Sequence, residues 1–129
     1  MPQFRISEAA TLLGVSDDTV RRWADHGRLE LHKDDSGRFA VDGRELAELA
    51  QQIAEAPERG GTSARNRLRG IVTKVVKDTV MAQVDLQAGP HRLVSLMSRE
   101  AADDLGLEVG AVAMAIVKST QIIVEVPKA

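Results

Sequence analysis

Apolar residues are spaced differently in the two halves of the chain. Up to about residue 53 they recur at intervals of three and four, as in Leu46, Leu49 and Ile53. That spacing is typical of one face of an α-helix. Beyond residue 63 they alternate or run in short β-branched blocks. Alternate residues such as Val80, Ala82 and Val84 fall on one face of a β-strand. The sequence therefore predicts a helical part followed by a β part.

The helical part is predicted to hold three helices and a two-stranded hairpin. Ser7 and Ser16 are suitable N-caps, and a glycine follows each of the first two helices. The DDSG tetrapeptide at 34–37 suits a hairpin turn, and Asp42 with Glu45 resembles a capping box. The predicted elements are helices over residues 7–13, 16–26 and 42–53 and strands over residues 29–33 and 38–41.

The β part is predicted to form a small barrel of short strands with one helix. The predicted strands cover residues 68–76, 80–86, 92–96, 111–118 and 121–126, and a helix capped by Ser98 covers residues 98–105. Between the two parts, Pro57, Gly60 and Gly61 favour a linker. The sequence thus predicts an α+β protein of two small domains, over residues 1–53 and 63–129, joined by a linker at 54–62.

The first two helices have the residues that a helix-turn-helix needs. Ala10 is small enough for the point where two helices cross, and Gly14 suits the tight turn between them. The shared core of such a motif would be made of Leu13, Val15, Val20 and Trp23. An ordinary pair of antiparallel helices is the alternative interpretation.

The segment FRISEAATLLGVSDDTVRRWADHGRLELHKDDSGRFAVDGREL (residues 4–46) resembles the MerR-like and excisionase-like winged helix-turn-helix domains. The resemblance implies a mostly α-helical DNA-binding domain whose recognition helix begins at Ser16 and whose hairpin forms a wing. The residues that it implies as contacts to double-stranded DNA are Ser16, Asp18, Thr19, Arg21 and Arg22 on the recognition helix and Lys33 and Arg38 on the wing. Alternatively, Arg21 and Arg22 lie on a solvated helix face and pair with Asp17, Asp18 or Asp25.

Two polar segments in the β part could bind an oxyanion. SARN at 63–66 and KST at 118–120 offer hydroxyls, backbone N–H groups and cations, which are the donors that a tetrahedral dianion requires. Neither segment is specific by itself, because each could be an ordinary polar turn. Together with DLGLEVG at 104–110, they make residues 63–126 resemble the Mop or TOBE domain of molybdate-binding proteins.

The Mop/TOBE resemblance implies an OB-like β-barrel that pairs with other copies and binds molybdate, or the nearly isosteric tungstate, between them. The oxyanion-binding residues that it implies are Ser63, Ala64 and Arg65 from one copy, Lys118 and Ser119 from another, and Thr79 through its backbone N–H. Asn66 is expected to brace the turn. Asp78 stands where that family often has glycine.

Composition excludes several classes of protein. The chain has no cysteine, so neither a disulfide scaffold nor a thiolate metal site can form. The three histidines are scattered, and no nucleophile–base pair or phosphate-binding glycine loop is evident, so we expect neither an enzyme nor a metal centre. Without a P-loop, an accessory domain of a transporter ATPase is also disfavoured.

The charge balance affects the DNA hypothesis. The net charge is −2. Lysines and arginines minus aspartates and glutamates give 7 − 10 = −3 for residues 1–53. An acidic domain should bind DNA weakly as a single copy, which favours a homo-oligomer, from a dimer up to a hexamer. Neither a signal peptide nor a membrane span is evident, so we expect a cytoplasmic location.

The function predicted from the sequence is a molybdate- or tungstate-responsive DNA-binding regulator of transcription. The alternative is an intracellular molybdate storage or homeostasis protein whose helical domain serves assembly.

Overall fold

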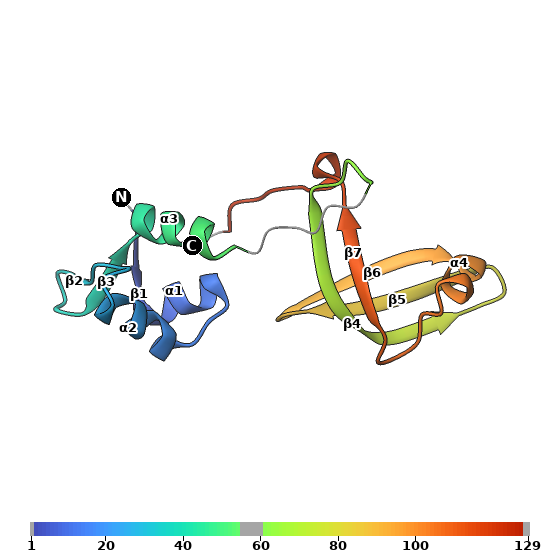
Figure 1. The fold of residues 1–129 in the computed structure, drawn as a ribbon, viewed down its shortest axis with the longest axis horizontal. Coiled ribbons are helices and arrows are strands. Elements are labelled where there is room, and N and C mark those ends of the chain that lie inside the picture. Colours follow the sequence, from blue (N-terminus) through green and yellow to red (C-terminus); the bar gives the residue numbers. More distant parts are fainter. Residues whose placement is uncertain (1, 55–60, 128–129) are drawn as a thin grey trace. The chain divides into compact units, whose positions relative to one another are not determined.

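The structure, a computed structural model, describes residues 2–54 and 61–127. The chain divides into two units, residues 1–56 and 57–129 (Figure 1). Most of the predicted linker at 54–62 lies outside the described residues. Among the described residues, no helix is long and apolar enough to cross a membrane.

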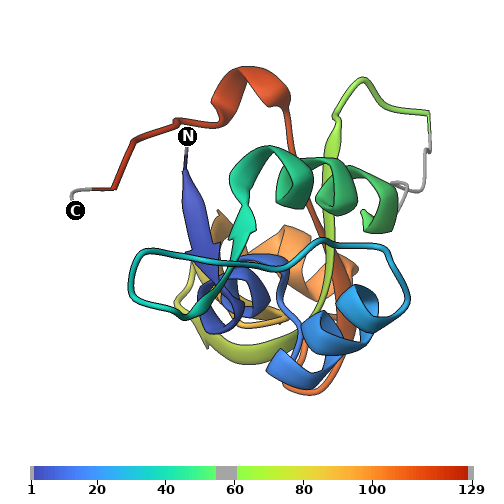
Figure 2. The same cartoon turned by 90° about the vertical axis from the view of Figure 1, so that its left-hand side faces the viewer.

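The N-terminal unit combines three helices with a small antiparallel sheet (Figure 2). Its elements are β1 (Gln3–Arg5), α1 (Ile6–Leu13), α2 (Asp17–Asp25), β2 (His32–Lys33), β3 (Phe39–Asp42) and α3 (Gly43–Ile53). The strands lie in the order β1-β3-β2. The three predicted helices and the hairpin are confirmed. The sequence analysis missed β1, which pairs with β3.

The helix-turn-helix core is arranged as its residue types predict. Ala10 and Val20 are buried, and Leu13, Val15 and Trp23 pack against them at the edge of the same cluster. Buried side chains from the rest of the unit complete this core: Ala9, Leu29, Val41, Leu46 and Leu49. Gly14 adopts a left-handed conformation, with φ of 68°, which a residue with a side chain rarely adopts. The small residue and the glycine therefore have the roles that we predicted.

One predicted helix start and one predicted capping contact are wrong, although α3 does begin after Asp42 as predicted. The helix α1 begins at Ile6, with Arg5 rather than Ser7 as N-cap, and the Arg5 N–H donates to Glu8 Oε1 at 3.0 Å. Since β1 leads directly into the helix, the cap falls at the last residue of the strand. At α3, Glu45 does not complete a capping box. Its Oε1 instead accepts a 2.7 Å hydrogen bond from the Glu30 N–H and so ties the helix to the start of the wing.

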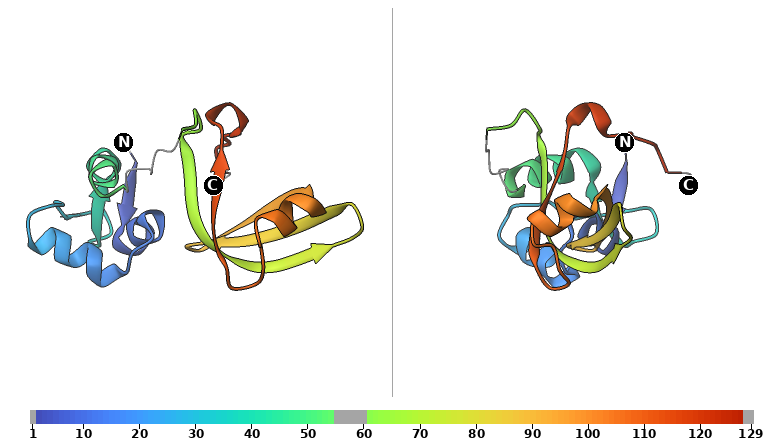
Figure 3. Two further views of the ribbon diagram at one scale, coloured as in Figure 1. Left: turned by 45° about the vertical axis from the view of Figure 1, so that its right-hand side comes forward. Right: turned by 90° about the vertical axis from the view of Figure 1, so that its right-hand side faces the viewer.

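The C-terminal unit is a curled four-stranded antiparallel sheet (Figure 3). Its elements are β4 (Asn66–Lys77), β5 (Met81–Ala88), β6 (His91–Ser98), α4 (Arg99–Asp104), β7 (Val112–Val117) and the 3-10 turn η1 (Ser119–Gln121). The strands lie in the order β6-β5-β4-β7. Ser98 caps α4 as predicted, because its Oγ accepts from the Ala101 N–H at 3.1 Å. The predicted α+β class is confirmed. In place of a closed barrel, the curled sheet forms a half-barrel.

The curl of the sheet depends on a close contact between β4 and β5. A Cβ atom on Gly70 would lie 2.7 Å from the Gln87 carbonyl oxygen, so only glycine fits there. Two residues later the β4–β5 register shifts between Val72 and Lys74, as at a β-bulge, which bends a strand. Val72, Val84 and Leu86 form the buried centre of the resulting concave face.

The fifth predicted strand, at residues 121–126, is wrong for this structure. After η1 the chain makes no ladder in the described residues up to 127. Ile123, Val124 and Val126 are 94%, 86% and 89% exposed. The alternating pattern alone does not make a strand, because no neighbouring strand edge of the same chain meets this segment.

Candidate functional site

The exposed side of α2 carries a row of hydrogen-bonded polar side chains. The Thr19 N–H donates to Ser16 Oγ at 3.1 Å, so Ser16 is the N-cap that the sequence predicts. The two hydroxyl oxygens lie 2.9 Å apart, and Arg22 Nη2 donates to Thr19 Oγ1 at 3.2 Å. This chain of contacts holds the Arg22 guanidinium along the helix surface.

Arg21 is placed differently from Arg22. Its Nη1 lies 3.6 Å from Asp18 Oδ1, and both side chains are largely exposed. An exposed ion pair of this kind contributes little to stability, so Arg21 can leave Asp18 at low cost. Both arginines face solvent. This exposure agrees with both interpretations of the pair, as DNA contacts and as residues of a solvated helix face. Trp23 faces the core instead, with the Arg28 guanidinium 5.7 Å from its ring centroid.

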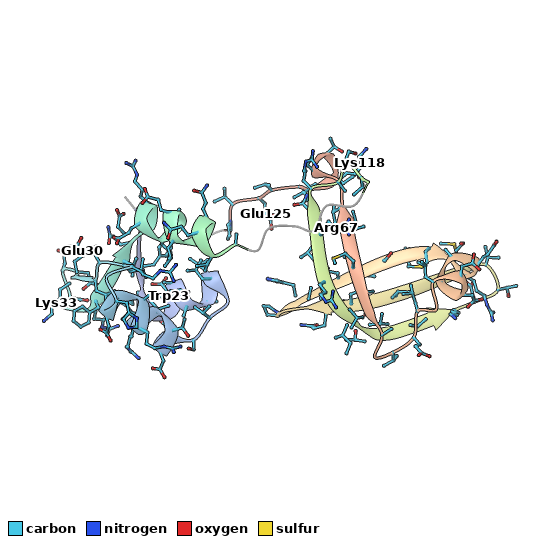
Figure 4. All side chains as sticks on the ribbon, viewed as in Figure 1. Trp23, Glu30, Lys33, Arg67, Lys118 and Glu125 are labelled. Atoms are coloured by element: carbon cyan, nitrogen blue, oxygen red, sulfur yellow. The ribbon has the colours of Figure 1, made fainter. Side chains whose placement is uncertain are left out.

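The wing between β2 and β3 is held by one carboxylate. Asp34 Oδ1 accepts hydrogen bonds from Ser36 Oγ at 2.6 Å, from the Ser36 N–H at 2.9 Å and from the Arg38 N–H at 3.0 Å. The bond from the Ser36 hydroxyl, followed by that from Arg38, lowers the pKa of Asp34 below its ordinary value. The turn leaves Lys33 and Arg38 exposed beside it, and Figure 4 shows Lys33 at the edge of the unit.

The two predicted oxyanion-binding segments meet at one end of the β4–β7 pair. Asn66 pairs with Val117 in the ladder, and Asn66 Nδ2 donates to the Val117 carbonyl oxygen at 3.1 Å. Residues 63–65 lead into this pair, and Lys118 and Ser119 follow it. A single chain therefore brings both segments together, and Asn66 has the bracing contact expected of it.

Most of the predicted donors at this strand end are open to solvent. Ser63, Arg65, Lys118 and Ser119 are exposed. Ala64 is buried, and its N–H donates to Thr62 Oγ1 at 3.2 Å. The Ala64 N–H, which the resemblance implies as a ligand donor, is thus engaged within the turn in this structure.

Thr79 lies far from the other predicted oxyanion-binding residues of the same chain. It follows β4 at the opposite end of that strand, which is 12 residues long. The turn is built by Asp78, whose Oδ1 accepts from the Val80 and Met81 N–H groups at 2.8 and 2.7 Å. These two bonds, with the larger effect from Met81, lower the pKa of Asp78. Asp78 therefore has a structural role, and Thr79 could reach the strand-end site only in another copy.

Arg67 is a residue of this strand end that the sequence analysis missed. It follows Asn66 on β4, and its Nε is buried without a hydrogen-bond partner in the described structure. A single arginine within an alternating strand gives no signal in the sequence, because most such residues extend into solvent. Within the described residues, no group of histidine, cysteine or acidic side chains could hold a metal ion.

Comparison with known proteins finds a family model that matches a region of each unit. The family described as TOBE domain matches residues 62–124, and the family described as MerR family regulatory protein matches residues 5–38. Neither description is that of an enzyme.

Individual relatives match the C-terminal unit. Molybdenum-pterin-binding protein 2 of Clostridium pasteurianum is 40% identical over 63 residues, which are 48% of this chain and 93% of the relative. A probable molybdenum-pterin-binding protein of Haemophilus influenzae is 42% identical over 65 residues, 50% of this chain and 94% of the relative.

Among solved structures, the cytoplasmic molybdate-binding protein ModG, in a form with molybdate bound, aligns with a TM-score of 0.50 and 30% identity. The alignment covers 77% of this chain and 55% of that one. The chain therefore belongs to the TOBE-domain family of molybdenum-pterin-binding proteins and has a MerR-family region in front of that domain.

Proposed function

We propose that the protein is a molybdate- or tungstate-responsive DNA-binding regulator of transcription. The observation that carries the proposal is the presence in one chain of two surfaces. One is a recognition helix with Arg21 and Arg22 exposed. The other is a strand end where residues 63–65 lie beside Lys118 and Ser119. The first surface suits DNA and the second suits an oxyanion.

The donors at the strand end match the chemistry of a tetrahedral dianion. Arg65 and Lys118 supply positive charge, and Ser63 and Ser119 supply hydroxyls. Charge-assisted hydrogen bonds to such an anion are about twice as strong as neutral ones. The relatives are named for binding molybdenum-pterin or molybdate, which makes molybdate the first ligand to test. Tungstate has nearly the same size and the same charge.

The exposed segment after η1 supports assembly of two or more copies. The concave face of the sheet contains a hollow of about 510 Å³, lined mainly by apolar side chains of β5, β6 and β7. Residues 122–126 form an exposed apolar strip with strand-like alternation. Exposed strand edges and contiguous apolar strips are usually covered in the native assembly. In the proposed assembly, this strip of one copy pairs with a sheet edge of another and covers its hollow.

The proposed assembly connects the two binding surfaces. Lys118 and Ser119 lie shortly before the apolar strip at residues 122–126, so an anion bound to them also restrains the strip. Each added copy brings another recognition helix, which compensates for the charge of −3 over residues 1–53. If the anion stabilises one arrangement of copies, linkage requires that anion and DNA alter each other's affinity by the same factor.

A mobility-shift titration tests this proposal. The probes are fragments from upstream of the protein's own gene, with and without saturating molybdate, in fixed salt. We expect the DNA affinity to change by at least about fivefold, which is the lower end of typical allosteric coupling. A DNA affinity that is identical with and without molybdate, in a protein that calorimetry shows to bind molybdate, would exclude the coupling.

A storage or homeostasis protein is the second candidate, because the N-terminal unit is acidic and Asp18 engages Arg21. The double variant R21Q/R22Q separates the two functions. A regulator should lose DNA binding in this variant while molybdate binding stays unchanged. A storage protein should bind molybdate in both forms and DNA in neither, even at low salt, where phosphate contacts are strongest.

A further inference from the structure

Arg67 has a polar group that the described part of the chain leaves unsatisfied. Its Nε is buried and has no hydrogen-bond partner there. Arg92 shows the usual situation, since its Nε and Nη2 donate to Asp85 Oδ2 at 3.0 and 2.9 Å. Buried N–H groups nearly always have a partner, so an exception calls for an explanation. A bound ligand is one such partner.

The strand register places Arg67 on the same face as the proposed oxyanion donors. Arg67 pairs with Ile116, and Asn66 pairs with Val117. Because side chains alternate between faces, Lys118 lies on the face of Ile116 and Arg67, provided that the backbone stays extended. It does, with φ of −64° and ψ of 142° at Lys118. Arg67 and Lys118 are thus diagonal neighbours on adjacent strands, a relation that long side chains can bridge.

Three cations gather at this strand end. Arg65 precedes Arg67 by two residues, and Lys118 follows β7 across the ladder; Figure 4 shows Arg67 and Lys118 at the same end of the β4–β7 pair. None of the salt bridges found among the described residues includes any of the three. The positive charge at this end is therefore available to a ligand.

We propose that Arg67 is a further anion-binding residue of this site and that its charge selects doubly over singly charged tetrahedral oxyanions. The inference rests on the proposed function, because it deepens the chemistry of the same site. The guanidinium remains charged at all relevant pH values and offers a planar fork of donors. The side chain as a whole is only partly buried. A rotation that turns its Nε–H and one terminal N–H toward two oxygens of one anion gives the Nε the partner that it lacks in the described structure. At the same distance, the Arg67 cation attracts a doubly charged anion about twice as strongly as a singly charged one, because the Coulomb energy is proportional to the charge of the anion.

Calorimetric titration of the full-length protein with two ions tests the inference. Molybdate is a tetrahedral dianion, and perrhenate is a tetrahedral anion with one charge. The variants are R67Q, R67K and, as matched control, R69Q. Arg69 is exposed, lies one pleat further from the strand end on the same face and carries the same charge. Physiological salt, with a Debye length of about 8 Å, limits effects of distant charge.

The expected results differ for each variant. R67Q should weaken molybdate binding by about tenfold or more, as loss of a charge-assisted bond does, and perrhenate binding by clearly less. R67K keeps the charge and loses the Nε–H, so it should weaken molybdate binding while retaining the preference for the dianion. R69Q should change both affinities by no more than about twofold.

The outcomes separate this inference from the proposed function. If R67Q binds both ions as the wild type does while K118Q loses molybdate, Arg67 has no part in the site and the site remains. Equal weakening of both ions by R67Q, with a lowered melting temperature, would show a structural role and overturn the inference. If R67Q does not fold, unchanged molybdate binding by R67K overturns it instead. A wild type that binds neither ion overturns the proposed function itself.

Discussion

The two units bury their apolar residues to different degrees. In the N-terminal unit, side chains from all three helices and from β3 surround Val20 and Val41, which are completely buried. In the C-terminal unit, the buried centre is small, and apolar residues along β6, β7 and the segment 122–126 remain exposed. A unit that closes its own core can fold alone, whereas one that leaves a hollow and an unpaired strip depends on a second copy. The comparison therefore predicts that the N-terminal unit is stable as a single copy, whereas the stability of the C-terminal unit depends on contacts with another copy.

The same difference extends to the binding surfaces. Contacts within one helix hold the Arg22 guanidinium of the N-terminal unit in place. Among the C-terminal cations, Arg67 has a buried donor that finds no partner in the part of the chain that the structure describes. Under the proposed function, the side chains that contact DNA are thus arranged before binding, and those that contact the anion are completed by a ligand or another copy.

The largest expected effect comes from closing the space at Gly70. In G70V, the Cβ would lie 2.7 Å from the Gln87 carbonyl oxygen, and this backbone atom cannot move without breaking the curled sheet. We expect the C-terminal unit to lose at least about 2 kcal/mol of stability, as overpacked sites do, and molybdate binding to fall with it. The N-terminal unit should melt as in the wild type.

G61V is the control for the Gly70 experiment. A Cβ on Gly61 would meet no atom of the described residues within 4 Å, so this variant should leave both melting transitions unchanged. Calorimetry would follow both transitions, and the fluorescence of Trp23 would follow that of the N-terminal unit alone. A single transition that G70V lowers for the whole chain would contradict the independence of the two units.

Val124 tests the dependence of the C-terminal unit on a second copy. Its side chain is 86% exposed, so V124D should not destabilise an isolated chain. If the strip is buried between copies, the charge removes an apolar contact worth about 1.5–3 kcal/mol. The dissociation constant of the assembly should then rise by roughly tenfold to a hundredfold, as measured by sedimentation.

V109D provides a comparison for this variant, because Val109 is also exposed and lies outside the strip. It should assemble as the wild type does. Unchanged sedimentation of V124D at all concentrations would show that residues 122–126 do not hold the copies together.

The sequence predicted most elements because their signals are local. Ser16 and Ser98 each stand just before apolar residues at helical spacing, and both cap helices. Gly14 occupies a left-handed turn. The strand β1 was missed because three residues are too few to show an alternation, and it forms only because β3 lies beside it. Glu45 was assigned to the wrong partner for the same reason: the competing donor, Glu30, lies 15 residues away.

The candidate site was predictable only in part. The segments 63–66 and 118–120 were identified by their motifs, and the ladder pair Asn66–Val117 explains why they meet. The difference in burial between Arg67 and Arg69 could not be predicted, since both occupy equivalent positions of one strand. Burial of a single Nε atom depends on how the sheet curls, which no local pattern records. The strand predicted over the strip at 122–126 is absent from the structure, because alternation in the sequence does not supply a strand edge to pair with.

The smallest expected effect is a difference in how the two units respond to acid. Among the described residues, the C-terminal unit has three carboxyl groups with a lowered pKa, Asp78, Asp85 and Asp103, and the N-terminal unit has Asp34. At Asp85, which is only 4% exposed, hydrogen bonds from Gln83 and then Arg92 lower the pKa.

A lowered folded-state pKa means that the unfolded chain binds the proton first as pH falls. The stability that these groups contribute is therefore complete well above 3.8, the ordinary value for aspartate, and is lost as pH falls through and below it. The melting temperature of the C-terminal unit should accordingly fall more steeply than that of the N-terminal unit between about pH 5 and pH 2.5. D85N should reduce the slope for the C-terminal unit alone, and equal slopes for both units in the wild type would contradict the assignment.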